Sequence, residues 1–109
     1  MADLTFRMLQ AQQRPWVRHN FGDRPAHHPL LGVQEEVGEL AHAHLKMEQG
    51  IRANESHDED AKDAVGDIVI FLADYCEARG WSFQDIVEFV WEGVRMRDWI
   101  KYPENGVTR

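Results

Sequence analysis

Apolar residues recur every three or four positions along most of this 109-residue chain, and no segment alternates apolar with polar residues as a half-buried strand would. Spacings of three and four place side chains on one face of an α-helix. We therefore expect an all-α fold, resembling a four-helix bundle. A chain of this length is close to the commonest domain size, so residues 1–109 should form a single helical domain.

The expected helices have recognisable end signals. Pro29 is a favourable first-turn residue for the second helix, and Gly50 and Gly80 are plausible C-caps of the second and third. Ser82 starts the fourth with a capping-box-like pattern, and Pro15 should kink or end the first. The predicted helices cover approximately residues 3–18, 29–49, 59–79 and 82–100.

The third predicted helix is apolar on more than one side. Val65, Val69 and Leu72 form one stripe at helical spacing, whereas Ile70 and Phe71 lie elsewhere around the helix. A helix of this kind is usually packed between two layers, which four helices of one chain supply poorly. We expect a homo-oligomer, a dimer or tetramer, that completes the bundle; a monomer with a few exposed apolar side chains is the alternative.

Composition excludes several classes of protein. The chain has 12 basic and 19 acidic residues and a net charge of −7, which disfavours binding to a nucleic-acid polymer. No apolar run approaches the roughly 20 residues of a membrane span, and the N-terminus lacks a signal-peptide core. The single cysteine, Cys76, lies in an apolar run and should be a buried thiol. We expect a cytoplasmic protein without a membrane partner.

The stretch GVQEEVGELAH concentrates negative charge within the second predicted helix. Glu39 is four residues after Glu35 and three after Glu36, so the like charges of these two pairs oppose helix formation. Glu36 borders the apolar stripe of this helix and Glu39 lies beside it. A solvated helix face would explain any one of these acids, but not their position at the margin of a core.

The third predicted helix carries a second group of acids. Asp60, Asp63, Asp67 and Asp74 recur at spacings of three, four and seven, and therefore share one side. Asp67 stands in the apolar sequence AVGDIVIFL, where an unpaired carboxylate would cost several kcal/mol. Carboxylates from two helices on a shared face favour a hard divalent cation, Mg²⁺ or alternatively Mn²⁺.

The two acidic segments resemble a known family. EEVGEL followed by DAVGDIVIFL resembles the MazG-like, all-α nucleoside triphosphate pyrophosphohydrolases, whose pattern is EExxE on one helix and ExxD on the next. The likeness extends through HHPLLGVQEEVGELAHAHLK and into VRMRDWIKYPENG. The resemblance implies an oligomeric helical bundle, dependence on Mg²⁺, and hydrolysis of a nucleoside triphosphate to the monophosphate and pyrophosphate.

The resemblance also implies roles for the acids. By motif position, Glu36, Glu39 and Asp67 are metal ligands, and Glu35 is a ligand, an outer-sphere group or a base. The chain departs from the pattern at Ala64, where ExxD calls for a glutamate. Asp63, on nearly the same face, could substitute with a shorter reach, so the fourth ligand and the number of metal ions stay open.

The remaining site residues follow from the chemistry of a triphosphate. A carboxylate not saturated by metal could accept a proton from the attacking water, and Glu35 or Glu39 is expected in this role. Positive side chains should bind the phosphates, and aromatic side chains should contact the base. The candidates for phosphate binding are Arg95, Arg97 and Lys101, and those for the base are Trp16, Phe21 and His28.

Two other functions fit parts of the pattern. Glu39 and His42 form an E-x-x-H arrangement like that of di-iron carboxylate bundles, but the chain lacks the second such motif. A non-catalytic helical module that binds a nucleotide or a protein partner, while retaining the acidic metal site, is the stronger alternative.

Overall fold

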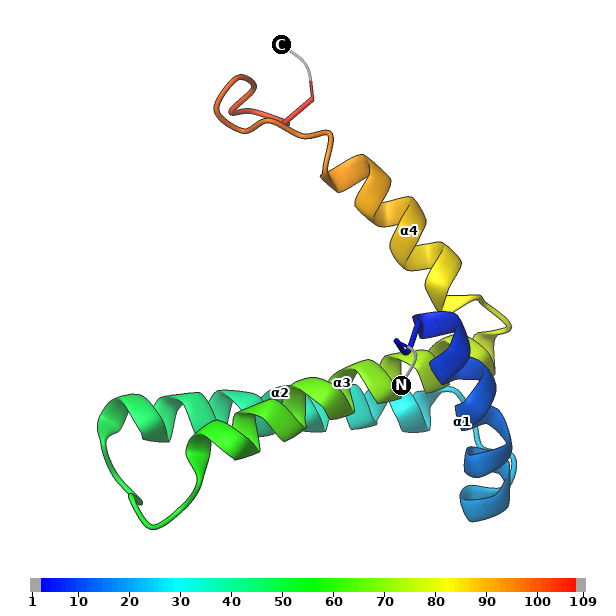
Figure 1. Cartoon of the computed structure of the whole chain (residues 1–109), viewed down its shortest axis with the longest axis vertical. Helices are drawn as coiled ribbons and strands as arrows, with labels where there is room; N and C mark the ends of the chain where they lie inside the picture. Colours follow the sequence, from blue (N-terminus) through cyan, green and yellow to red (C-terminus); the bar gives the residue numbers. More distant parts are fainter. Residues whose placement is uncertain (1–2, 108–109) are drawn as a thin grey trace.

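The computed structural model describes residues 3–107, whose regular elements are all α-helices, with no strand in that range (Figure 1). This confirms the all-α prediction, while the predicted domain ends, residues 1–2 and 108–109, lie outside the described part. None of the described helices is both long and apolar enough to cross a membrane. The helices are α1 (Phe6–Phe21), α2 (His27–Gln49), α3 (His57–Arg79) and α4 (Phe83–Val94).

Helix α1 begins after a threonine cap. The Thr5 hydroxyl accepts a hydrogen bond from the backbone N–H of Met8 at 3.0 Å, which satisfies one of the free donors of the first turn. Pro15 lies inside the helix and does not end it. The prediction that the helix ends at Pro15 is therefore wrong, and the kink stays a prediction. The helix ends at Phe21, and Gly22 follows with a φ of +68°, a conformation that favours glycine.

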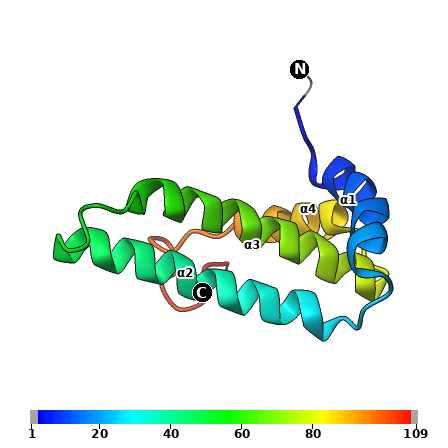
Figure 2. The same cartoon turned by 90° about the horizontal axis from the view of Figure 1, so that it is seen from below.

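Helices α2 and α3 form an antiparallel pair and lie side by side along their lengths (Figures 1 and 2). Both end at a left-handed glycine, Gly50 with φ +68° and Gly80 with φ +73°, as predicted. The two helices approach closely near Gly32, where an added Cβ would lie 2.5 Å from the ring of Phe71.

Helix α4 begins as predicted and ends early. The Ser82 hydroxyl accepts a hydrogen bond from the Asp85 N–H at 3.2 Å. The predicted continuation to Ile100 is wrong, because the helix ends at Val94. The Asp98 carboxylate accepts hydrogen bonds from the N–H groups of Ile100 (3.0 Å) and Lys101 (2.9 Å), and such local bonds favour a turn over a helix.

The core is small and lies where α1, α3 and α4 meet. Cys76 is buried there, as predicted, and burial raises the pKa of its thiol. Gln10 of α1 connects the three helices: its amide nitrogen donates to Glu77 and to the Trp81 carbonyl, and its oxygen accepts from the Phe83 N–H at 2.9 Å. The packed residues are Ala73, Cys76 and Phe83, with Phe6, Leu9, Val69, Leu72 and Val87 against them.

The chain is extended for its size. Its radius of gyration is 17.6 Å, whereas a compact domain of this length has about 13 Å. Helix α4 packs on α3 near its start and then projects away from the α2–α3 pair (Figure 1), and among the described helices it has no contact with α2. Phe89 is 83% exposed and Ile100 is 97% exposed. The four helices of the described residues do not close into a bundle within one chain.

Candidate metal centre

A groove of about 570 Å³ lies between α2 and α3. Its lining contains five carboxylates and one imidazole, and none of the residues that line it is a lysine or an arginine. The nearest lysine in sequence, Lys62, pairs instead with Asp58 (3.2 Å) and Glu59 (3.4 Å). The lining residues are Glu35, Gly38, Glu39, His42, Ala43, Asp60, Asp63, Ala64 and Asp67.

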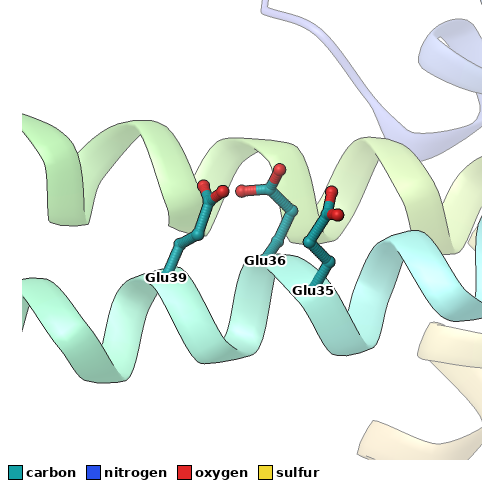
Figure 3. Close-up of side chains that lie close together, drawn as sticks. All are labelled: Glu35, Glu36 and Glu39. Carbon is teal, nitrogen blue, oxygen red and sulfur yellow. The ribbon is translucent and has the colours of Figure 1, made fainter.

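Three glutamates of α2 converge beside this groove. Carboxylate oxygens of Glu35, Glu36 and Glu39 all lie within 4.8 Å of one another, and the three side chains extend toward α3 (Figure 3). Glu39 can approach the other two because it lies three residues after Glu36 and four after Glu35, one helical turn further along the same surface. This is the cluster that the sequence GVQEEVGELAH predicts.

Glu36 is the unusual member of the cluster. It is 8% exposed, and its Oε2 atom is buried without a hydrogen-bond partner in the described part of the chain. The pKa of Glu36 is raised, first because burial removes water from the carboxylate and then because it hydrogen-bonds to Glu39. The negative charges of Glu39, Asp67 and Glu35 raise it further. A buried, partnerless oxygen among like charges is typical of a cation ligand.

Helix α3 supplies the opposite wall. Asp67 is half-buried and Asp63 is exposed, and both line the groove. Ala64 is 2% exposed, so the position where the ExxD pattern has a glutamate carries a buried methyl group. Asp63 and Asp67 line the groove but do not join the three glutamates whose carboxylate oxygens lie within 4.8 Å of one another, and the substitution of Asp63 for that glutamate stays a prediction.

Asp74 has a different role from the other aspartates. It forms a buried ion pair with Arg24 of the turn between α1 and α2. Its charge is already compensated, and it does not line the groove. The periodicity that placed Asp74 on the face of Asp67 is correct, but the folded turn supplies its partner.

The predicted substrate-binding residues lie outside the groove. Arg95 pairs with Glu92 at 3.2 Å, and Arg95, Arg97 and Lys101 all follow α4, in the part of the chain that Figure 1 shows far from the α2–α3 pair. Trp16 and Phe21 of α1 stack edge-to-face at 5.8 Å, and both are exposed. His28 stacks on His27 at the start of α2. Their roles toward a substrate stay predictions.

The structure adds two residues to the groove. Asp60 is seven residues before Asp67, and His42 is three after Glu39. Helical spacing from the predicted ligands is the signal that could have found both, but the sequence pattern favours His42 as a packing or surface residue.

The donor set of the groove fits a hard divalent cation. Carboxylate oxygens are the ligands that Mg²⁺ and Mn²⁺ take, and the buried Oε2 atom of Glu36 has no hydrogen-bond partner among the described residues. Neither family models, curated proteins nor solved structures give a match to this chain.

Proposed function

We propose that this protein is an Mg²⁺-dependent nucleoside triphosphate pyrophosphohydrolase that cleaves the α–β phosphoanhydride bond. The products are a nucleoside monophosphate and pyrophosphate. The observation that carries the proposal is Glu36, whose buried oxygen lacks a partner in the described part of the chain and faces three further acids. The resemblance of EEVGEL and DAVGDIVIFL to the MazG-like enzymes supports the choice of substrate.

The acids divide into ligands and a base. Glu36, Glu39, Asp67 and Asp63 would hold the cation, which when bound polarises phosphoryl oxygens and lowers the pKa of coordinated water. Glu35 is exposed in the cluster, and Glu35 or Glu39 would accept the proton of the attacking water. As the new P–O bond forms, the bond to the bridging oxygen breaks and pyrophosphate leaves.

The positive side chains of this proposal come from a second copy. An acidic groove binds a triphosphate only if cations other than the metal also compensate the phosphate charge. The segment after α4, which carries Arg95, Arg97 and Lys101, lies away from the α2–α3 pair of its own chain (Figure 1). The exposed apolar side of α4, with Phe89 at its centre, would be buried between subunits in a homodimer or homotetramer. This packing would bring Arg95, Arg97 and Lys101 to the groove of a partner. The expected location is the cytoplasm, where nucleotides are abundant.

A panel of canonical and modified nucleoside triphosphates, incubated with the protein and Mg²⁺, tests the activity. Pyrophosphate release that Glu36→Gln and Asp67→Asn abolish supports the proposal. Glu48→Gln is the matched control, because Glu48 is an exposed acid of α2 that pairs with His44 and does not line the groove. Release of orthophosphate would mean that a different bond is cleaved. Tight nucleotide binding without turnover would favour the non-catalytic module.

A further inference from the structure

A separate cavity of about 150 Å³ lies where α1, the α1–α2 turn and α3 meet. It shares no lining residue with the acidic groove. Its lining contains three arginines and three acids, and each arginine pairs with one of the acids. Because these opposite charges cancel at short range, the cavity suits a neutral polar ligand better than an anion. The pairs are Arg14–Glu77, Arg18–Asp23 and Arg24–Asp74.

Two of the residues that line this cavity each carry a buried polar atom without a partner. The Nε atom of Arg24 and the Oε1 atom of Gln13 are buried, and neither has a hydrogen-bond partner among residues 3–107. The first is a donor and the second is an acceptor. A buried donor or acceptor without a partner destabilises the folded chain, and a ligand that bonds to it removes this cost.

Neighbouring contacts fix the side chains that carry these two atoms. The Nε2 atom of Gln13 donates to the Ile70 carbonyl at 2.8 Å, which sets the position of Oε1 on the same amide. A terminal nitrogen of Arg24 pairs with Asp74, and the guanidinium lies 4.8 Å from the centre of the Phe21 ring. The donor and the acceptor are therefore held in place before a ligand binds, which lowers the entropic cost of binding.

The cavity follows the acidic groove along α3. Asp67 lines the groove and Asp74 lines the cavity, and the seven residues between them correspond to about 10.5 Å along one face of the helix. Gln13 contacts α3 between these two aspartates, at Ile70. A nucleotide with its phosphates beside Asp67 would extend along this face and bring its base to the cavity.

We propose that this cavity binds the nucleobase of the triphosphate. The Oε1 atom of Gln13 would accept a hydrogen bond from a base N–H, and the Nε–H of Arg24 would donate to a ring nitrogen or carbonyl oxygen of the base. Nucleobases carry such donors and acceptors side by side on their hydrogen-bonding edges. The planar guanidinium of Arg18, whose ion pair with Asp23 is long at 3.9 Å, would stack on the base. The inference rests on the proposed function, because it takes the ligand to be the triphosphate.

NMR titration of the full chain with the four ribonucleosides, in the presence of a chelator, tests this site without the metal and without phosphate. At least one nucleoside should shift the side-chain N–H signals of Gln13 and Arg24. Gln13→Met removes the polar atoms at similar length, and Arg24→Lys keeps a positive charge for Asp74 but removes Nε. Each variant should weaken nucleoside binding about tenfold.

The matched controls are exposed residues outside the cavity. Gln12→Met and Arg7→Lys make the same exchanges on α1 and should bind nucleosides as the wild type does. Helical circular dichroism shows whether each variant is folded, and either Gln13→Met or Arg24→Lys alone is enough for the comparison.

Three results would overturn the base site. These are an absence of nucleoside binding, binding that neither Gln13→Met nor Arg24→Lys weakens, and a shift of the Arg24 signal by inorganic phosphate but by no nucleoside. Pyrophosphate release separates this inference from the proposed function. Release with the same KM in the wild type and both variants overturns the base site alone. Nucleoside binding at Gln13 and Arg24 by a wild type that releases no pyrophosphate overturns the hydrolysis and leaves a nucleoside site.

Discussion

Arg24, in the turn between α1 and α2, forms a buried ion pair with Asp74 of α3, fifty residues along the chain. Their side chains are only 19% and 9% exposed. The guanidinium of Arg24 also lies 4.8 Å from the centre of the Phe21 ring. The ion pair therefore holds the α1–α2 turn against α3. Helix α3 forms the wall of the groove opposite α2.

Replacing Asp74 with alanine should lower the free energy of unfolding by about 3–5 kcal/mol, because it leaves the Arg24 guanidinium buried without its counter-charge. Urea denaturation measures this loss. Arg7→Ala is the control: it removes the exposed ion pair between Arg7 and Asp85 and should cost much less. Equal losses in the two variants would show that the buried pair has no special role.

Gly32→Ala should destabilise the protein by about 1–3 kcal/mol, since the new Cβ would lie 2.5 Å from the Phe71 ring and force α2 and α3 apart. Gly66→Ala in α3 meets nothing within 4 Å and should instead stabilise by up to about 1 kcal/mol through helix propensity. Thermal unfolding of both variants checks the opposite signs. A stabilising Gly32→Ala would contradict the close approach of the helices.

Glu36→Gln should stabilise the metal-free protein at pH 7. The folded chain holds the Glu36 proton more tightly than the unfolded chain, because the folded pKa is raised above 4.5. This contribution to stability is complete below pH 4.5 and is lost as the pH rises through the folded pKa. The Tm of the variant should therefore exceed that of the wild type at pH 7, and the difference should shrink toward pH 4.5.

Added Mg²⁺ should reverse this order by raising the Tm of the wild type more than that of Glu36→Gln. Scanning calorimetry with and without a chelator gives both comparisons. Glu48→Gln, an exposed acid on the same helix, should show neither effect. A metal-free Glu36→Gln that is less stable than the wild type at pH 7 would contradict the charge crowding described for the cluster.

Phe89→Asp should convert the proposed oligomer into monomers, because it places a charge in the middle of the apolar side of α4. Size-exclusion chromatography with light scattering measures the change in mass. Gln12→Asp adds the same charge at an exposed polar position of α1 and should leave the mass unchanged. A wild-type chain that is monomeric at high concentration would refute the proposed supply of Arg95, Arg97 and Lys101 by a partner.

Local signals were enough to predict α2, α3 and the acidic cluster. Gly50 and Gly80 mark the helix ends because the residue after the last turn adopts a left-handed conformation, which glycine takes without strain. The burial of Glu36 follows from its place at the edge of an apolar stripe, since helical spacing alone decides which side faces α3. These features depend on residues a few positions apart.

Features set by distant residues could not be predicted. The pairing of Asp74 with Arg24 depends on how the α1–α2 turn folds onto α3, which periodicity cannot show. Helix α4 ends at Val94, and in the segment after it Asp98 accepts hydrogen bonds from the backbone of Ile100 and Lys101, a local competition with helix that apolar spacing does not reveal. The position of His42 opposite Asp60 and Asp63 likewise required the packed helices.

Anomalous diffraction from crystals soaked in Mn²⁺ tests the central claim most directly. We predict a strong anomalous peak bonded to carboxylate oxygens of Glu36, Glu39 and Asp67, and loss of that peak in Glu36→Gln crystals. Fully hydrated carboxylates at these three positions, with manganese bound only elsewhere on the protein, would contradict the account.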